Sequence, residues 1–174
     1  MRKPPKRIQR ERNLRDPKGR RLRRALPART ALQGLAERAR FQPWEKHKLH
    51  PRRFGLPLYN GIDEDRTFCD GDADFEPRDY QRIPNWLRQG ILAGLISEND
   101  INGDPQLIWA ITEAGWIFEG RITIPGQAVY HGYPVLPNEA IAADVLSRCE
   151  RTLLQGRHQD MAQALAACRR RYPS

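Results

Sequence analysis

A histidine flanked by two tyrosines, near the end of a predicted strand, is the arrangement in this chain best suited to acid–base chemistry. The neutral imidazole of His131 could take a proton from a nucleophile, and a neighbouring phenol could orient a substrate. Arginine and glutamate side chains from the preceding strand would reach the same point. The candidate catalytic set is therefore Tyr130, His131, Tyr133, Arg121 and Glu119. The structural alternative is that the hydroxyls and the imidazole satisfy backbone groups where the strand ends.

Two further histidines, His47 and His50, stand three residues apart, with Glu45 before them and Pro51 directly after. Two imidazoles and a nearby carboxylate could bind a metal ion or move protons. The alternative, which the basic surroundings favour, is a pair of exposed histidines in a loop.

A short acidic run, residues 70–74, has the D-x-D-x-D spacing of a calcium loop. Phe75 stands at the sixth position, where such a loop needs glycine, and Gln81 stands at the twelfth, where it needs glutamate. The three cysteines are far apart and form no C-x-x-C pair. The sequence therefore predicts an acidic turn, no metal site, no cofactor and no disulfide, and reduced thiols indicate a cytoplasmic protein.

Charge is distributed very unevenly along the chain. Residues 1–53 contain 19 Lys and Arg against 4 Asp and Glu, a net charge of +15, whereas residues 54–174 contain 11 against 17, a net charge of −6. Such asymmetry is typical of a segment that binds a polyanion, and guanidinium groups contact phosphates in a two-pronged fashion. The candidate nucleic-acid-binding residues are Arg7, Arg10, Arg12, Arg15, Lys18, Arg20, Arg21, Arg23, Arg24 and Arg29.

Hydrophobic periodicity predicts the elements that must position these side chains. Residues 107–112 are rich in β-forming types, and residues 116–124 alternate between two faces, which indicates a strand with one buried face. Turns at 113–115 and 125–126 and a third strand at 128–133 complete a predicted antiparallel meander. On the second strand, Glu119 and Arg121 share the face opposite Phe118. Helices are expected at residues 28–40, 77–97, 138–154 and 159–170. The predicted fold class is α+β: a small three-stranded antiparallel meander flanked by helices and preceded by a basic extended arm.

The chain divides into three predicted segments. Residues 1–40 form a basic, largely extended arm, with a short helix near 28–40. Residues 41–76 are irregular, rich in aromatic and acidic residues, and expected to pack on the domain and hold the arm to it. Residues 77–174 form the α+β domain.

Three functions follow from these features. The charge asymmetry favours a nucleic-acid-associated binding protein, with RNA ahead of DNA, whose arm contacts the phosphate backbone. A second hypothesis is a small bacterial or mobile-element nuclease or toxin that cuts without a metal at His131, because small RNA-cutting toxins use similar sets of His, Tyr, Arg and Glu on a small sheet. A third is an adaptor whose acidic body binds a protein partner.

The sequence lacks the motifs that are typical of several enzyme classes. There is no glycine-rich phosphate loop, no serine nucleophile elbow and no H-E-x-x-H motif, so binding is favoured over catalysis. No apolar run approaches the roughly 18 residues that a membrane-spanning helix requires, so no membrane partner is expected.

Overall fold

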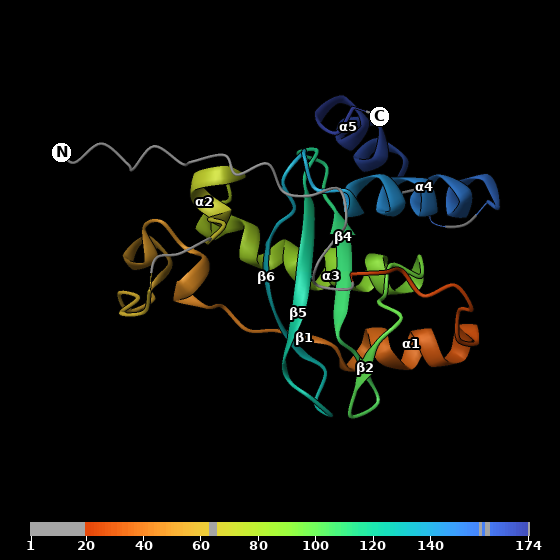
Figure 1. The fold of residues 1–174 in the computed structure, drawn as a ribbon, viewed down its shortest axis with the longest axis horizontal. Helices are drawn as coiled ribbons and strands as arrows, with labels where there is room; N and C mark the ends of the chain where they lie inside the picture. Colours follow the sequence, from red (N-terminus) through yellow and green to blue (C-terminus); the bar gives the residue numbers. More distant parts are fainter. Residues whose placement is uncertain (1–19, 63–65, 157, 159–160, 174) are drawn as a thin grey trace.

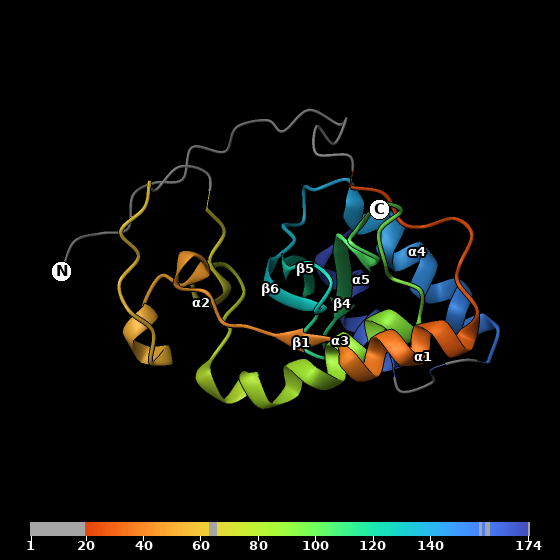
Figure 2. The same cartoon turned by 90° about the horizontal axis from the view of Figure 1, so that it is seen from below.

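The computed structural model describes residues 20–62, 66–156, 158 and 161–173. These residues form three layers, with a sheet between two groups of helices (Figure 1, Figure 2). Helices α1 (Arg29–Arg38) and α3 (Ile83–Leu92) cover one face of the sheet, and α4 (Ile141–Leu154) and α5 (Ala162–Arg171) cover part of the other. The predicted α+β class is confirmed.

The main sheet has four strands in the order β1-β6-β5-β4. Strands β4 (Leu107–Ile111), β5 (Ile117–Ile124) and β6 (Val129–Pro134) pair in antiparallel fashion. Strand β1 (Arg40–Phe41) pairs with β6 in parallel, so the sheet is mixed. The prediction of a three-stranded antiparallel meander is therefore wrong as a description of this sheet. A strand of two residues has no alternation from which the sequence could have predicted it.

The helix around α3 is shorter than its predicted range of 77–97. A 3₁₀ helix, η3 (Pro77–Arg82), leads into α3, and Pro84 lies in the first turn, where its missing N–H costs nothing. Gly94 lies just past the end with φ +75°, a conformation that favours glycine. The chain is then extended, and Ile96 forms an antiparallel bridge to Ile108 on β4.

Short elements fill the segment between β1 and η3. They are η1 (Glu45–His47), η2 (Pro51–Phe54) and α2 (Cys69–Asp72). The thiol of Cys69 donates a hydrogen bond to the carbonyl of Gly132 on β6 at 3.4 Å. This segment therefore lies beside the β6 edge of the sheet.

A small hairpin of β2 (Asp100–Ile101) and β3 (Asp104–Pro105) precedes β4. Its turn residues, Asn102 and Gly103, have φ of +50° and +83°, which is the backbone a two-residue hairpin turn requires.

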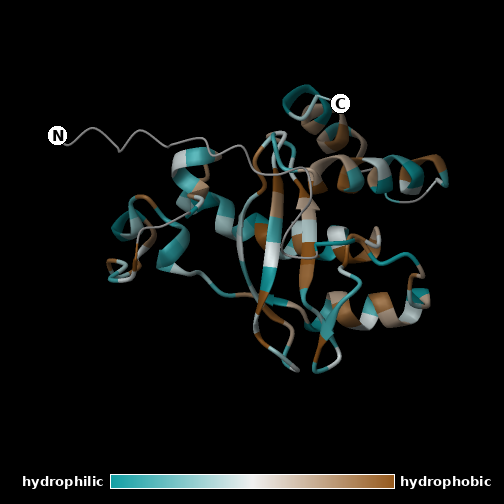
Figure 3. Cartoon of the chain, viewed as in Figure 1, coloured by the Kyte–Doolittle hydropathy of each residue, from teal (hydrophilic) through white to brown (hydrophobic). Residues whose placement is uncertain are grey.

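The two faces of the sheet bury separate apolar clusters. Leu107, Trp109 and Ile117 pack with α4 and α5 on one face. Ile108 and Tyr130 pack with α1 and α3 on the other. Figure 3 shows a hydrophilic stretch in the middle of β5 between hydrophobic ends, so charge enters the interior of the sheet there. Among the described residues, no helix is both long enough and apolar enough to cross a bilayer.

Candidate functional site

The strand register gathers four of the five predicted catalytic residues on one face of the sheet. Tyr133 on β6 lies opposite Glu119 on β5, and His131 lies opposite Arg121. Side chains two residues apart on a strand share a face, so all four project to the same side. We call these four residues the polar-face cluster.

Tyr130 does not join the polar-face cluster. It is adjacent to His131 on β6, so its side chain points to the opposite face. It is 1% exposed, and its hydroxyl donates a hydrogen bond to the carbonyl of Pro105 at 2.9 Å. Burial raises the pKa of Tyr130 well above its ordinary value. Tyr130 is a core residue with a satisfied hydroxyl.

Glu119 is the centre of the cluster and is fully buried. Its Oε2 accepts hydrogen bonds from Trp109 Nε1 at 2.9 Å and from Arg20 Nη1 at 3.2 Å. Its Oε1 accepts a hydrogen bond from the Tyr133 hydroxyl and lies 3.8 Å from Arg121 Nη2. A buried, unpaired carboxylate costs several kcal/mol, and these donors offset that cost. Glu119 is therefore occupied in holding the cluster together.

His131 lies beside three side chains at the end of the cluster. Its Nδ1 is 2.8 Å from Thr123 Oγ1. The ring of His47 stacks on it at a centroid distance of 5.5 Å and an angle of 10°, and the edge of Trp44 meets it at 4.5 Å. His47 also lies 4.7 Å from the ring of Tyr133. The site therefore contains two histidines from distant parts of the chain.

His47 and His50 do not form the exposed pair that the basic surroundings favoured, because His47 is buried against His131. The backbone N–H of His50 donates to Asp70 at 2.9 Å, and its side chain is exposed. His47 is 7% exposed, and its Nδ1 lies 3.2 Å from the carbonyl of Thr67, so Nδ1 carries the proton and donates it. The sequence indicated both His47 and His131 as candidates, but it could not show that their rings are in contact.

Both imidazoles are neutral at pH 7. Burial lowers the pKa of His131 from 6.5 to about 3, with further lowering by His47, Arg121 and Lys46. Burial likewise lowers the pKa of His47 to about 4, although its hydrogen bond to Thr67 opposes the shift. Burial also raises the pKa of Tyr133 well above its ordinary value, and the Glu119 carboxylate adds to the effect. The site is thus a hydrogen-bonded, largely uncharged pair of rings beside a buried ion network.

The acidic run at 70–74 makes local hydrogen bonds. Asp70 accepts the backbone N–H of Leu49 at 2.7 Å, and Asp72 accepts that of Phe68 at 2.8 Å. In the part of the chain that the structure describes, no group of three His, Cys, Asp or Glu side chains is arranged to hold a metal ion.

The structure describes five of the ten predicted nucleic-acid-binding residues, and two of these five form ion pairs with carboxylates of the same chain. Arg20 pairs with Glu139 at 2.8 Å as well as with Glu119, and Arg23 pairs with Asp100. The remaining five lie outside the described residues: Arg7, Arg10, Arg12, Arg15 and Lys18.

The remaining three of the five described candidates are exposed: Arg21, Arg24 and Arg29. The backbone between them is held on the body, since Leu22 bridges to Ser97 and the N–H of Arg23 donates to the carbonyl of Ile96 at 2.9 Å. Residues 20–24 therefore form an anchored segment, in which Arg20, Leu22 and Arg23 are partly buried against the body and Arg21 and Arg24 are exposed.

A second buried charge lies at the same sheet edge but faces the opposite side. Lys48 is 3% exposed, and its Nζ lies 5.1 Å from the rings of Phe54 and Phe75 and 5.8 Å from that of Tyr80. Each cation–π contact stabilises by about 0.5–2 kcal/mol, whereas removing an ammonium from water costs several kcal/mol. Sequence reasoning missed Lys48, because it reads as one more cation in a basic stretch.

No protein-family profile, curated protein or solved structure matches this chain.

Proposed function

We propose that this protein binds nucleic acid, RNA in preference to DNA, through its basic N-terminal region. The observation that carries the proposal is the anchored segment, in which Arg20 and Arg23 are tied to the body while Arg21 and Arg24 project into solvent. The net charge of +15 over residues 1–53 supplies long-range attraction to phosphate.

Anchoring favours affinity because the backbone is already ordered before the ligand arrives. Less conformational entropy is then lost when Arg21 and Arg24 each contact a phosphate. Arg29, exposed at the start of α1, adds a third cation close by in sequence.

The preference for RNA rests on Trp44. This residue is 37% exposed, and Lys46 Nζ lies 5.3 Å from the centroid of its ring, so an aromatic ring and a cation lie together. A chain of contacts runs from Trp44 through His47, Tyr133 and Glu119 to Arg20, so the tryptophan and the anchored segment are parts of one connected region. Unpaired bases stack on such rings, and single-stranded loops are far commoner in RNA than in DNA.

The test compares two triple variants of the full chain that lose equal charge. One is Arg21→Ala, Arg24→Ala and Arg29→Ala. The control is Arg88→Ala, Arg151→Ala and Arg170→Ala, which removes three exposed arginines from α3, α4 and α5. Binding to single-stranded RNA, duplex RNA and duplex DNA is measured between 50 and 200 mM salt.

The first triple variant should bind more weakly, with a log–log salt slope on single strands reduced by about 2, since each lost phosphate contact removes about 0.7. The control should keep the slope of the unaltered protein. Trp44→Ala should weaken only the single-stranded complex, by about 1–3 kcal/mol. Equal slopes for the two triple variants would overturn the proposal.

A second function is favoured by one specific observation, the contact of His47 with His131 beside Tyr133. Two imidazoles can share the proton transfers of metal-independent RNA cleavage, one taking the 2′-hydroxyl proton and the other protonating the leaving group. With both pKa values depressed to about 3 and 4, the acid form is scarce at pH 7, so the cleavage rate should rise as the pH falls toward 4.

This second function is tested with a labelled RNA in the presence of a chelator. His131→Ala and His47→Ala should each abolish cleavage, while His50→Ala, at an exposed histidine, should leave it unchanged. If the His131→Ala variant still cleaves the RNA, the assignment of His131 as a catalytic residue is wrong.

A further inference from the structure

We propose that the apolar cavity between α3 and the sheet binds a short-chain carboxylate, whose anionic head is held by the Lys48 ammonium. The cavity lies on the sheet face opposite the polar-face cluster. None of the proposed nucleic-acid-binding side chains Arg21, Arg24, Arg29 and Trp44 lines it, so the two sites are separate.

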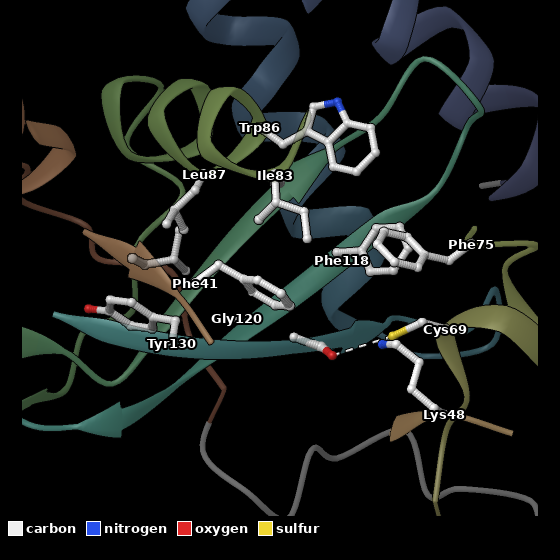
Figure 4. A pocket seen from close by; sticks show the side chains of 13 residues that line it. Phe41, Lys48, Cys69, Phe75, Ile83, Trp86, Leu87, Phe118, Gly120 and Tyr130 are labelled. Atoms are coloured by element: carbon white, nitrogen blue, oxygen red, sulfur yellow. Dashed lines mark hydrogen bonds between the residues drawn. The ribbon is translucent and has the colours of Figure 1, made fainter. Parts of the chain in front are cut away.

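The cavity exists because two glycines face each other across the sheet. Gly120 on β5 is paired with Gly132 on β6, and both line the cavity. Neither has a side chain to fill the space under Phe41 and α3. The result is a cavity of about 60 Å³ walled almost entirely by apolar groups (Figure 4).

Lys48 is the one charged side chain in the wall. Figure 4 shows its amino group beside the sulfur of Cys69, at one end of the space that Phe75 and Phe118 border. Within the described ranges, no carboxylate pairs with this ammonium. Its neighbours are the three aromatic rings and the Cys69 thiol, whose pKa is raised by burial, so that the thiol stays neutral.

An anion is the missing complement of this arrangement. The rings of Phe54, Phe75 and Tyr80 stabilise the cation but supply no acceptor atom for its N–H groups. The Tyr80 hydroxyl in the same cluster is buried and has no hydrogen-bond partner among the described residues. A carboxylate provides up to four acceptor sites and an opposite charge.

The size of the cavity limits the apolar part of the ligand. A dry cavity of 150 Å³ holds one benzene molecule, which has six carbon atoms, so about 60 Å³ holds roughly two or three. The ligand class is therefore a carboxylate of about three or four carbons including the carboxyl carbon, and butanoate, with three apolar carbons, is the probe.

The experiment titrates the full chain with butanoate, 1-butanol and butylammonium by NMR. Butanoate should bind with a dissociation constant on the order of 1 mM, and the alcohol and the amine at least about tenfold more weakly, because only the anion meets Lys48. Lys48→Met, which keeps length and removes charge, should weaken butanoate binding about tenfold and leave 1-butanol binding unchanged.

A cavity-filling variant tests the site without touching the charge. A Cβ at Gly120 would meet Ile108 O at 3.5 Å, and one at Gly132 would meet Phe41 Cε2 at 3.7 Å; both are ordinary contacts. The Gly120→Ala, Gly132→Ala double variant should therefore fold and lose butanoate binding. Gly34→Ala, on the exposed side of α1 with open space around it, is the control and should bind normally.

Thermal unfolding of each variant establishes that it is folded. The proposal is overturned if folded, unaltered protein does not bind butanoate at 10 mM (roughly ten times the expected dissociation constant). It is also overturned if 1-butanol binds as tightly as butanoate, or if Lys48→Met or the double glycine variant binds butanoate normally.

Discussion

The two faces of strands β5 and β6 bury charge in opposite ways. On one face, the Glu119 carboxylate accepts hydrogen bonds from Trp109, Tyr133 and Arg20, so its burial is matched by donors. On the other, the Lys48 ammonium is surrounded by aromatic rings that offer it no acceptor oxygen. The same sheet thus holds one charge that is internally satisfied and one with unused binding capacity.

This difference separates a buried charge that stabilises the fold from one that is available to bind a ligand. A buried ion with a full set of partners stabilises one arrangement of the chain and has little left to offer a ligand. A buried ion without an opposite charge, next to a cavity, is a candidate for recognition. Three measurements test this contrast.

The largest effect is expected from removing the satisfied charge. Glu119→Ala removes the acceptor of the Tyr133 hydroxyl and of the Trp109 N–H, and one of the carboxylates that pair with Arg20, and it should lower the free energy of unfolding by about 3–5 kcal/mol. Chemical denaturation measures this directly.

The matched control for that variant is Glu150→Ala, which removes an exposed ion pair with Arg169 and should cost at most about 1 kcal/mol. Similar losses in the two variants would mean that the Glu119 network contributes no more than a surface pair.

A smaller effect is expected from protonating His131 of the polar-face cluster and His47, which stacks on it. Folding lowers the pKa of His131 to about 3 and that of His47 to about 4, from 6.5, so the unfolded chain binds more protons below pH 6.5. Stability is therefore fully present above pH 6.5 and is lost as the pH falls toward 4. At pH 5, each imidazole should cost about 2 kcal/mol relative to pH 7.

Urea unfolding at pH 7 and pH 5 checks this expectation. His131→Gln should reduce the loss between the two pH values by about half, whereas His50→Gln, at an exposed position, should not change it. An undiminished loss in His131→Gln would show that the cluster is not the source of acid sensitivity.

The smallest effect, and one of opposite sign, is expected at Lys48. Lys48→Met replaces a buried ammonium by an apolar side chain of similar length and should raise the free energy of unfolding by about 1 kcal/mol. Lys46→Met, at a partly exposed position, should change stability by less than about 0.5 kcal/mol. A loss of stability in Lys48→Met would mean that the rings alone satisfy the charge, which would remove the contrast between the two faces.

Much of the fold was predictable because it depends on local patterns. Alternation along β5 placed Glu119 and Arg121 on one face, and the antiparallel pairing then brought them to His131 and Tyr133. The same alternation separates Tyr130 from His131, since neighbours on a strand point to opposite faces. The predicted segment boundaries at residues 40 and 76 stay a prediction, as do the compartment and the partner.

Long-range contacts were decided only by the tertiary structure. Arg20 reaches Glu119 across 99 residues of chain, and His47 meets His131 because a loop that follows β1 runs along the edge of β6. The neighbouring residue Lys48 points to the other face and enters the cavity left by Gly120 and Gly132. Periodicity encodes which face a side chain occupies, but which distant segment covers that face depends on packing the whole chain. The sequence by itself therefore determined the charge asymmetry, the α+β class and the polar face of β5 that Glu119 and Arg121 form. The partners of that face, and the cavity on the opposite face of the sheet, follow only from the assembled fold.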